Sequence, residues 1–252
     1  MECLDRPLRL AIVSDLHFGW GRVGRAFARQ IKRRVLATAA DAVLFLGDLA
    51  GGGGKGSHPD RVVAGAAALA GYSAPMGCYA ILGNHEWKDD PLARARGEGP
   101  NQAERLLTDA GWTVLENRAV DLGGVWLAGL SSQRAFQQRR GLRSTVIGLD
   151  DLPATLAETT GDAPIILMAH EPDIFPQLPD RVCLTLSGHM HGGQIRPFGR
   201  ALYAPSRYGT RFAYGLYEDR EKTLIVSGGL GCSGLPLRYG LPPEITLVDL
   251  VP

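Results

Sequence analysis

The sequence predicts an α/β sandwich, a fold in which helices cover β-sheets. Short, continuous apolar runs such as Leu8–Val13 and Ala42–Leu46 have the length and composition of buried strands. The segment between these two runs has an apolar residue at every fourth position, as an amphipathic helix requires. Strands that alternate with helices along a chain favour α/β architecture. Because no linker, repeat or long low-complexity tract interrupts the 252 residues, we expect a single domain spanning residues 1–252.

The first half of the chain shows this alternation most clearly. A helix is expected over about residues 22–39, and a second from Pro59, a residue favoured in the first helical turn, to about Ala70. The glycine tract Gly51–Gly54 before the second helix predicts a flexible turn, or a close approach of substrate beside Asp48. The other elements expected here are the strands Leu8–Val13, Ala42–Leu46 and Cys78–Leu82 and a helix over Asn101–Ala110.

The second half begins with shorter runs that alternate between apolar and polar residues. These runs predict antiparallel strands of a second sheet, at Thr113–Leu115, Ala119–Leu122 and Val125–Leu130. The polar, arginine-rich stretch Ser131–Ser144 predicts a long loop. The remaining elements expected are a helix over Leu152–Thr159 and strands at Ile165–Met168, Val182–Leu186, Gly215–Tyr217, Thr223–Ser227 and Ile245–Leu250.

Composition excludes several classes of partner. The formal net charge is +1, so there is no global attraction to nucleic acid, and none is expected as a partner. No run approaches the roughly 20 apolar residues of a membrane span, and the first residues lack a signal-peptide core. The four cysteines include no C-x-x-C pair and are expected to be reduced thiols. We therefore expect a cytoplasmic protein whose only membrane contact would be peripheral, at the inner membrane. The sequence indicates no oligomeric state.

Polar clusters stand where five of the predicted buried strands end. Ligands of open α/β sheets bind just outside the carboxyl ends of strands, so these side chains should meet at one rim. Five of the six histidines of the chain belong to the clusters, and only His58 does not. Structural histidines scattered at random would not be distributed in this way. The clusters are Asp15 with His17, Asp48, Asn84 with His85, His170, and His189 with His191.

The residue types in these clusters indicate a metal centre. Asp, Asn and His without Cys form a mixed oxygen and nitrogen ligand set, which suits Mn²⁺, Fe or Zn²⁺. There are too many ligands for one ion. They fit a pair of ions about 3.5–4 Å apart, the spacing of two-metal phosphoryl-transfer sites. We therefore expect two divalent cations as cofactors, with Mn²⁺ favoured.

The motifs Asp-x-His, Gly-Asp, Gly-Asn-His-Glu, a single His and Gly-His-x-His, in this order, resemble the calcineurin-like metallophosphoesterase family. The resemblance implies a four-layer α/β/β/α sandwich with two central mixed sheets. It implies attack on a phosphodiester or pyrophosphate bond by a hydroxide that bridges the metals. His85 would be catalytic, facing the scissile phosphate. The implied ligands are Asp15, His17 and His191 for one metal, Asn84, His170 and His189 for the other, and Asp48 as the bridge.

The C-terminal motifs are similar to a bacterial branch of YkuE- and YaeI-like phosphodiesterases. These motifs are Gly188–Gln194, Gly229–Arg238 and Pro242–Thr246. The branch includes enzymes that cleave UDP-2,3-diacylglucosamine in lipid A synthesis, so the resemblance implies a small-molecule or lipid-linked phosphoester as substrate. One departure matters: protein phosphatases of the superfamily follow Gly-Asp with Asp-Arg-Gly, whereas Gly47-Asp48 is followed by Leu-Ala-Gly-Gly-Gly. The sequence therefore does not favour a phosphoprotein phosphatase.

Charge counting supports an anionic substrate. Two divalent ions bring +4, while Asp15, Asp48 and a bridging hydroxide bring −3, and the residual +1 favours a phosphate. His85 is placed to protonate or stabilise the departing oxygen. Glu86 is expected either to orient His85 or to lie on the solvated surface.

Three groups of basic residues are open to two interpretations, either as solvated charges or as contacts to anions. Helix 22–39 has a basic face that could meet anionic lipid. The stretch Ser131–Ser144 has arginines around Phe136 that could form a substrate lid. The arginines after the histidine pair are candidate substrate-binding residues. The members are Arg22, Arg25, Arg29, Lys32 and Arg33; Arg134, Arg139, Arg140 and Arg143; and Arg207, Arg211 and Arg238.

Two other functions remain open on the sequence alone. A phosphomonoesterase or cyclic-nucleotide phosphodiesterase of the same superfamily would use the same metals. A non-catalytic scaffold of the same fold is a different class, but such scaffolds typically lose metal ligands or the catalytic histidine. Every one of these positions is filled in this chain.

Overall fold

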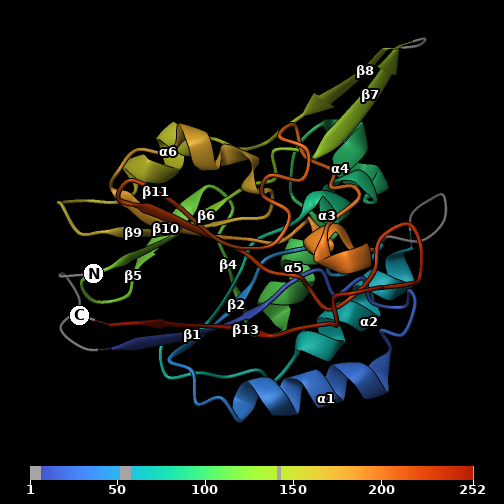
Figure 1. The fold of residues 1–252 in the computed structure, drawn as a ribbon, viewed down its shortest axis with the longest axis horizontal. Coiled ribbons are helices and arrows are strands. Elements are labelled where there is room, and N and C mark those ends of the chain that lie inside the picture. The colour runs from blue at the N-terminus through green and yellow to red at the C-terminus, as the bar shows by residue number, and fades with distance from the viewer. Residues whose placement is uncertain (1–6, 52–57, 141–142, 252) are drawn as a thin grey trace.

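Two large mixed β-sheets lie face to face at the centre of the molecule (Figure 1). The computed structural model describes residues 7–51, 58–140 and 143–251. The N-terminal stretch with Cys3, and the glycines of the predicted turn beyond Gly51, lie outside the described residues. The fold is thus the mixed α/β sandwich that the sequence predicts.

The first sheet has five strands in the order β13-β1-β2-β3-β4. The four strands β1 to β4 run parallel to one another, and β13 pairs antiparallel with β1. Their carboxyl ends therefore point to the same edge. The strands are β1 (Leu8–Val13), β2 (Ala42–Phe45), β3 (Cys78–Ala80), β4 (Thr113–Val114) and β13 (Thr246–Leu250).

The second sheet has six strands in the order β11-β12-β10-β9-β6-β5. The inner four are parallel, and the edge strands β11 and β5 are antiparallel to their neighbours. The strands are β5 (Arg118–Asp121), β6 (Trp126–Leu130), β9 (Ile165–Ala169), β10 (Val182–Ser187), β11 (Gly215–Asp219) and β12 (Lys222–Val226).

Alternation along the strands builds the layers. Leu10 and Ile12 of β1 pack between the two sheets against Met168 of β9, whereas Val13 of β1 packs on the opposite face with the helices. Successive side chains of a strand point to opposite faces, so each buried strand serves two apolar layers. The same holds for Leu167 of β9, which packs on the outer face of the second sheet. Because these strands are buried on both faces, their sequences are continuous apolar runs and do not alternate between apolar and polar residues.

Helices cover the outer face of each sheet. Ile31 of α1, Leu69 of α2 and Leu107 of α5 join the apolar layer outside the first sheet. Leu156 of α6 and Phe175 of a 3₁₀ helix join the layer outside the second sheet. The result is four layers, as the sequence resemblance implies. The helices are α1 (Arg25–Leu36), α2 (Pro59–Leu69), α5 (Gln102–Asp109) and α6 (Leu152–Ala157), with short 3₁₀ helices at Pro172–Gln177, His191–Gly193 and Pro197–Gly199.

Two expectations about the middle of the chain are wrong. Ser131–Ser144 is not a loop throughout, because β7 (Phe136–Arg140) and β8 (Arg143–Ile147) form an antiparallel hairpin that projects from the body of the molecule (Figure 1). The segment Thr113–Leu115 does not join the second sheet, since β4 pairs in parallel with β3 at the edge of the first. The other two alternating runs do form an antiparallel pair in the second sheet.

Two short helices follow β3 without a counterpart in the sequence prediction: α3 (Asn84–Lys88) and α4 (Pro91–Arg96). Of the cysteines in the described residues, Cys78 and Cys232 are free thiols, and Sγ of Cys183 donates to the backbone oxygen of Ile165 at 3.4 Å. Over the same residues, no helix combines the length and apolarity needed to cross a bilayer.

Candidate metal centre

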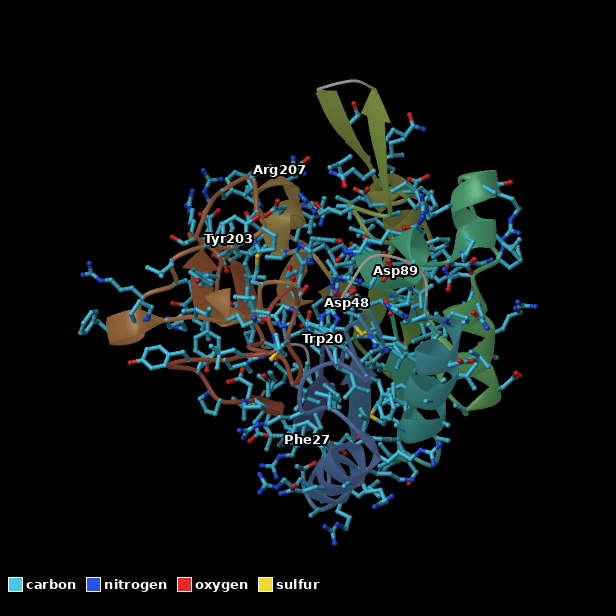
Figure 2. The ribbon with its side chains drawn as sticks, turned by 90° about the vertical axis from the view of Figure 1, so that its right-hand side faces the viewer. Trp20, Phe27, Asp48, Asp89, Tyr203 and Arg207 are labelled. Atoms are coloured by element: carbon cyan, nitrogen blue, oxygen red, sulfur yellow. The ribbon has the colours of Figure 1, made fainter. Side chains whose placement is uncertain are left out.

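The seven predicted metal ligands converge at one edge of the sandwich, where β1, β2, β3, β9 and β10 end. The first sheet contributes four of them and the second sheet three. All seven side chains are buried. Figure 2 looks onto this region, with Asp48 near the centre of the view. The first-sheet residues are Asp15, His17, Asp48 and Asn84, and the second-sheet residues are His170, His189 and His191.

One group of donors is formed by Asp15, His17, Asp48 and His191. Each offers one ligand atom, and these atoms lie within 4.8 Å of one another. Nε2 of His17 is 3.0 Å from Nε2 of His191 and 3.4 Å from Oδ2 of Asp48. A hydrogen bond between these two rings would need one Nε2 to donate and the other to accept, and would use the lone pair of only one of them. A cation between them would satisfy both lone pairs.

A second group is formed by Asp48, His170 and His189, again with ligand atoms within 4.8 Å. Nε2 of His170 is 3.4 Å from Oδ2 of Asp48. Oδ1 of Asn84 and Nε2 of His189 are buried and have no hydrogen-bond partner among the described residues. Buried polar atoms are seldom left without a partner, so such orphaned donor atoms fit a metal site. Asp48 belongs to both groups, which is the position of a bridging ligand.

Ligands must bind in their deprotonated form, and most of the predicted ligands meet this requirement; at His170 a cation would have to replace a proton. Burial lowers the pKa of His17, His189 and His191, so these imidazoles are neutral. Burial would raise the pKa of Asp48, but the charges of His170 and His85 outweigh it and hold the pKa well below its usual value. Burial would lower the pKa of His170, but the negative charge of Asp48 outweighs it and raises the pKa well above its usual value. The Asp48 carboxylate therefore favours a positive charge at the position between it and His170.

The backbone at the ligands is strained. Asp15, His17, Asp48, His189 and His191 all have a positive φ, between 44° and 64°, which L-residues seldom adopt. Such strain persists only where the surroundings enforce it, and it concentrates at functional sites. Here hydrogen bonds between the loops enforce it: Asp15 N donates to Gly47 O, His17 N to Asp48 O, and His189 N to Oδ1 of Asp15. The strained turns aim side chains from separate strands at common points.

Glycines allow these loops to lie in contact. A Cβ atom at Gly83 would overlap Oδ1 of Asp48, and one at Gly188 would overlap Oγ of Ser14. A Cβ at Gly229 would lie 2.8 Å from Cβ of Asp15. The segment around Gly229 follows β12, and Leu230 N donates to Ser14 O. The glycines before Asn84 and His189 are therefore part of the site, because side chains there would push the two sheets apart.

His85 lies beside the ligands on α3 rather than in either donor group. Nδ1 of His85 is 2.7 Å from Oδ2 of Asp89, and its Nε2 is 2.8 Å from Nζ of Lys88. An ammonium group can only donate, so this arrangement gives His85 a proton on Nδ1 and an acceptor at Nε2. Figure 2 shows Asp89 close to Asp48 in projection. The sequence analysis missed Lys88 and Asp89. Their spacing of three and four residues from His85 was the available signal.

Glu86 has neither of the roles expected for it. Its carboxylate is buried and accepts hydrogen bonds from the backbone N–H groups of Asp48, Leu49 and Gly83, at 2.7–2.8 Å. It therefore lies neither on the surface nor against the His85 ring. Instead it fixes the turn that presents Asp48 and holds that turn against the start of α3. Positioning of a ligand by outer groups of this kind is common in metal sites.

A cavity of about 510 Å³ opens over the metal groups. Lys88 and Arg134 bring positive charge to it, and Leu202, Tyr203 and Leu235 form an apolar wall. The arginine-rich stretch was open to two interpretations, solvated charges or a substrate lid. Its member Arg134 lines the cavity, as the second interpretation requires. The side chains of Arg139, Arg140 and Arg143 lie outside the described residues. The complete lining includes Asp48, Asn84, His85, His189, His191 and Gln194.

The loop that carries Arg134 is held in place by hydrogen bonds to Glu171. Oε1 of buried Glu171 accepts from Oγ of Ser132 at 2.6 Å, and Oε2 accepts from Gln133 N at 3.0 Å. Nε2 of Gln133 donates to the backbone oxygen of Glu171 at 2.7 Å. Glu171 directly follows the predicted ligand His170. The loop that carries Arg134 is therefore tied to the strand end that carries a ligand.

The three arginines predicted to bind substrate are not brought together at the cavity. Arg207 lies 3.6 Å from Asp173, and Arg211 lies over the ring of Phe212. Neither is among the residues that line the cavity. Arg238 is largely enclosed and donates to the backbone oxygens of His191, Gly228 and Gly231. Its observed contacts hold the loops around His191 in place, and a contact of these arginines with substrate stays a prediction.

Buried carboxylate, amide and imidazole donors at the strand ends of an α/β sandwich are typical of metal-dependent hydrolases. Comparison with known proteins narrows this class. The family model for calcineurin-like phosphoesterases matches residues 8–193. The chain belongs to this family, and it carries the family's phosphoester hydrolase fold together with a buried Asp/His metal-binding cluster.

The relatives are metallophosphoesterases of several organisms. A metallophosphoesterase of Helicobacter pylori strain J99 is 29% identical over 255 residues, covering 100% of this chain and 62% of the relative. YkuE of Bacillus subtilis strain 168 is 32% identical over 212 residues, covering 83% and 68%. A Danio rerio transmembrane protein with metallophosphoesterase domain is 31% identical over 255 residues, covering 96% and 53%. The chain thus spans about three fifths of the Helicobacter relative.

Proposed function

We propose that the protein is a dinuclear metal-dependent phosphodiesterase or pyrophosphatase. The observation that carries the proposal is the pair of donor groups that share Asp48 beneath one open cavity. Two cations on a common carboxylate suit in-line displacement at phosphorus. Mn²⁺ is the metal we favour, because the donors are oxygen and imidazole nitrogen without thiolate.

Two divalent ions, when bound, would neutralise phosphate charge and lower the pKa of a bound water. The residues of the chain then have separate tasks. Lys88 and Arg134 attract the anionic substrate into the cavity. His85, held by Asp89, would take a proton on Nε2 from Lys88 and pass it to the departing oxygen. Lys88 is the cation nearest to that nitrogen and can supply the proton that the departing oxygen takes.

The apolar wall of the cavity supports a substrate with an apolar part. Leu202, Tyr203 and Leu235 line the same cavity as the charged groups. A lipid-linked nucleotide such as UDP-2,3-diacylglucosamine would place its pyrophosphate at the metals and its acyl chains along this wall. A small phosphomonoester or a cyclic nucleotide would leave the wall unused, so we rank these substrates second. A non-catalytic scaffold ranks last, because every predicted ligand reaches the site.

Hydrolysis assays test the proposal. The protein is assayed with bis-p-nitrophenyl phosphate, p-nitrophenyl phosphate and UDP-2,3-diacylglucosamine, each with and without added Mn²⁺. We expect metal-dependent cleavage of bis-p-nitrophenyl phosphate and of UDP-2,3-diacylglucosamine, with faster cleavage of the lipid-linked substrate. Preference for the monoester would establish the second candidate. Metal binding without hydrolysis of any of the three would favour the scaffold.

A further inference from the structure

Exposed apolar side chains are concentrated in two chain segments that also contribute to the lining of the cavity. Six of the thirteen large exposed apolar residues found in the described part of the chain belong to two segments, 194–205 and 233–241. Phe198 is 100% exposed, and the other five are 56–73% exposed. Single exposed apolar residues are ordinary, whereas a patch of them marks an interaction surface. We call this patch the apolar rim: Phe198, Leu202, Tyr203, Leu235, Leu237 and Tyr239.

The two segments of the apolar rim are held together. Ile195 and Tyr239 form a parallel β-bridge, in which Arg196 N donates to Tyr239 O and Tyr239 N donates to Gln194 O. Nε2 of Gln194 donates to Leu235 O at 3.0 Å. The guanidinium of Arg196 donates to the backbone oxygens of Gly192 and Gly199, on both sides of Phe198. The exposed side chains therefore stand on a fixed backbone.

The segments that carry the apolar rim contain arginines and no acidic residue, and of the acids from other segments Asp173 pairs with Arg207 while Glu244 accepts from Tyr214 and Gly228. From His189 to Tyr217 the chain contains four arginines and no Asp or Glu, and from Ser227 to Pro243 it contains Arg238 and again no acid. The whole chain has a net charge of only +1, so this face is locally cationic. Arg200 and Arg211, which lie on or close to the first of these segments in the sequence, are exposed. Their positive charge complements an anionic partner.

We propose that the apolar rim docks the protein on an anionic lipid bilayer. Aromatic and aliphatic side chains enter the interface between headgroups and acyl chains, and arginines beside them reach the phosphates. Tyr203 and Tyr239 have the amphipathic rings that are enriched at this depth. If two copies of this chain met through the rim, the arginines of one copy would face those of the other. Repulsion between these like charges disfavours self-association through the rim.

The docked surface is continuous with the catalytic cavity and with a second groove. Leu202, Tyr203 and Leu235 belong both to the rim and to the cavity wall. On the other side, Leu237 lines a groove of about 620 Å³ that extends to Phe27 at the start of α1. Figure 2 labels Tyr203 and Phe27 on this face. Docking would thus set the mouth of the cavity against the bilayer. The proposal concerns bilayer binding and does not depend on which phosphoester is cleaved.

Vesicle sedimentation tests the proposal with the full chain and no substrate. Wild-type protein is mixed with vesicles of equal phosphatidylglycerol and phosphatidylcholine, and with pure phosphatidylcholine vesicles. The rim variant combines Phe198→Ser, Leu237→Ser and Tyr239→Ser, none of which lines the cavity. The matched control combines Leu92→Ser, Leu216→Ser and Leu247→Ser, which are also exposed but lie outside both segments. Hydrolysis of bis-p-nitrophenyl phosphate, expected unchanged in both, reports correct folding.

We expect the affinity of the rim variant for anionic vesicles to fall about tenfold or more, because three apolar side chains that would be transferred from water into the bilayer have been replaced by serine. The control variant should bind within about twofold of wild type. Three results would overturn the proposal: no binding of wild-type protein to anionic vesicles, equal binding to neutral vesicles, or full binding by the rim variant. A fourth variant, Arg25→Glu with Arg29→Glu and Arg33→Glu, tests the basic face of α1. If only that variant loses binding, α1 and not the rim is the docking surface.

Discussion

Asp48 stands in both donor groups, and this position is its most informative property at the level of single residues. Among the described residues, no other predicted ligand is a member of both groups. The carboxylate lies 3.4 Å from a histidine of each group, His17 and His170. One side chain therefore couples the occupancy of two cation positions.

Asp48→Asn is expected to lower metal content from two ions to fewer than one per chain and to reduce activity by more than about 100-fold. The amide keeps the shape of the side chain but removes the negative charge. Metal content is measured by mass spectrometry after gel filtration, with exposed Asp109→Asn as the control. Two ions retained per chain would show that Asp48 is not the bridge.

His85→Ala is expected to keep both ions, since His85 belongs to neither donor group. Removing a positioned proton-transfer group should lower kcat by roughly 10²–10⁴-fold. The same replacement at His58, which lies outside the cavity lining, should leave kcat unchanged. Loss of metal together with activity in His85→Ala would mean that His85 is a ligand after all.

Most of the metal centre could be predicted from sequence because each ligand directly follows a buried apolar strand. Lys88 and Asp89 could not, because the five-residue helix α3, which ends at Lys88 and has Asp89 as its C-cap, is too short to show an apolar period. The role of Glu86 was equally hidden. A carboxylate that binds backbone N–H groups leaves no pattern in the side chains around it.

At the scale of elements, turns are held to strands by buried carboxylates. Glu86 ties the Asp48 turn to α3 through three backbone N–H groups. Glu116 accepts from Leu82 N after β3 and from Oγ of Ser131 after β6. Because β3 and β6 belong to different sheets, Glu116 links the two sheets near the site.

Glu86→Gln should destabilise the fold by about 1–3 kcal/mol and weaken metal binding by about 10–100-fold. The amide nitrogen cannot accept, so at least one buried N–H group loses its partner. Thermal unfolding and metal titration measure the two effects. Exposed Glu98→Gln is the control. Unchanged metal affinity in Glu86→Gln would show that the turn around Asp48 does not need this anchor.

Glu116 gives a pH-dependent prediction. Burial raises its pKa from 4.5 to about 8, against hydrogen bonds from Ser131 and Leu82 that lower it. The folded state thus holds the proton more tightly than the unfolded state, and stability is lost as pH rises from about 4.5 to about 8. The unfolding free energy of Glu116→Gln should therefore rise relative to that of wild type with increasing pH, by about 4 kcal/mol between pH 5 and pH 9. A difference in unfolding free energy that does not change with pH would contradict this.

The elements that sequence analysis misplaced have little apolar surface. Strands β7 and β8 are mostly polar and pair only with each other, so no apolar alternation distinguishes them from a loop. Strand β4 is two residues long, and nothing in it specifies which sheet it joins. Long buried strands and α1, α2, α5 and α6 were predictable because their apolar faces fill the layers between them.

At the scale of the whole molecule, the metal centre lies between two sheets, each of which provides part of every donor group. Asp15 and His17 come from the first sheet and His191 from the second, while Asp48 of the first sheet joins His170 and His189 of the second. Cation binding and the packing of the sheets must therefore support each other.

Removal of metal should lower thermal stability. A ligand present at 100 times its Kd stabilises the folded state by about 2.7 kcal/mol per site, equivalent to about 5–10 °C for a chain of this length. We expect EDTA to lower the Tm of wild-type protein by at least this amount, and added Mn²⁺ to restore it. The Tm of Asp48→Asn should barely respond to either. An equal response in both proteins would place the stabilising cations elsewhere.

The order of the ligands along the chain has a consequence for how the protein can diverge. Four predicted ligands lie at or before Asn84 and three at or after His170, and none lies in the 85 positions between. That interval nevertheless supplies Lys88 and Arg134 to the cavity and carries the projecting β7–β8 hairpin. Natural variation can therefore remodel substrate choice there while the inherited metal chemistry stays intact. Substrate preference among relatives should follow this interval more closely than overall identity.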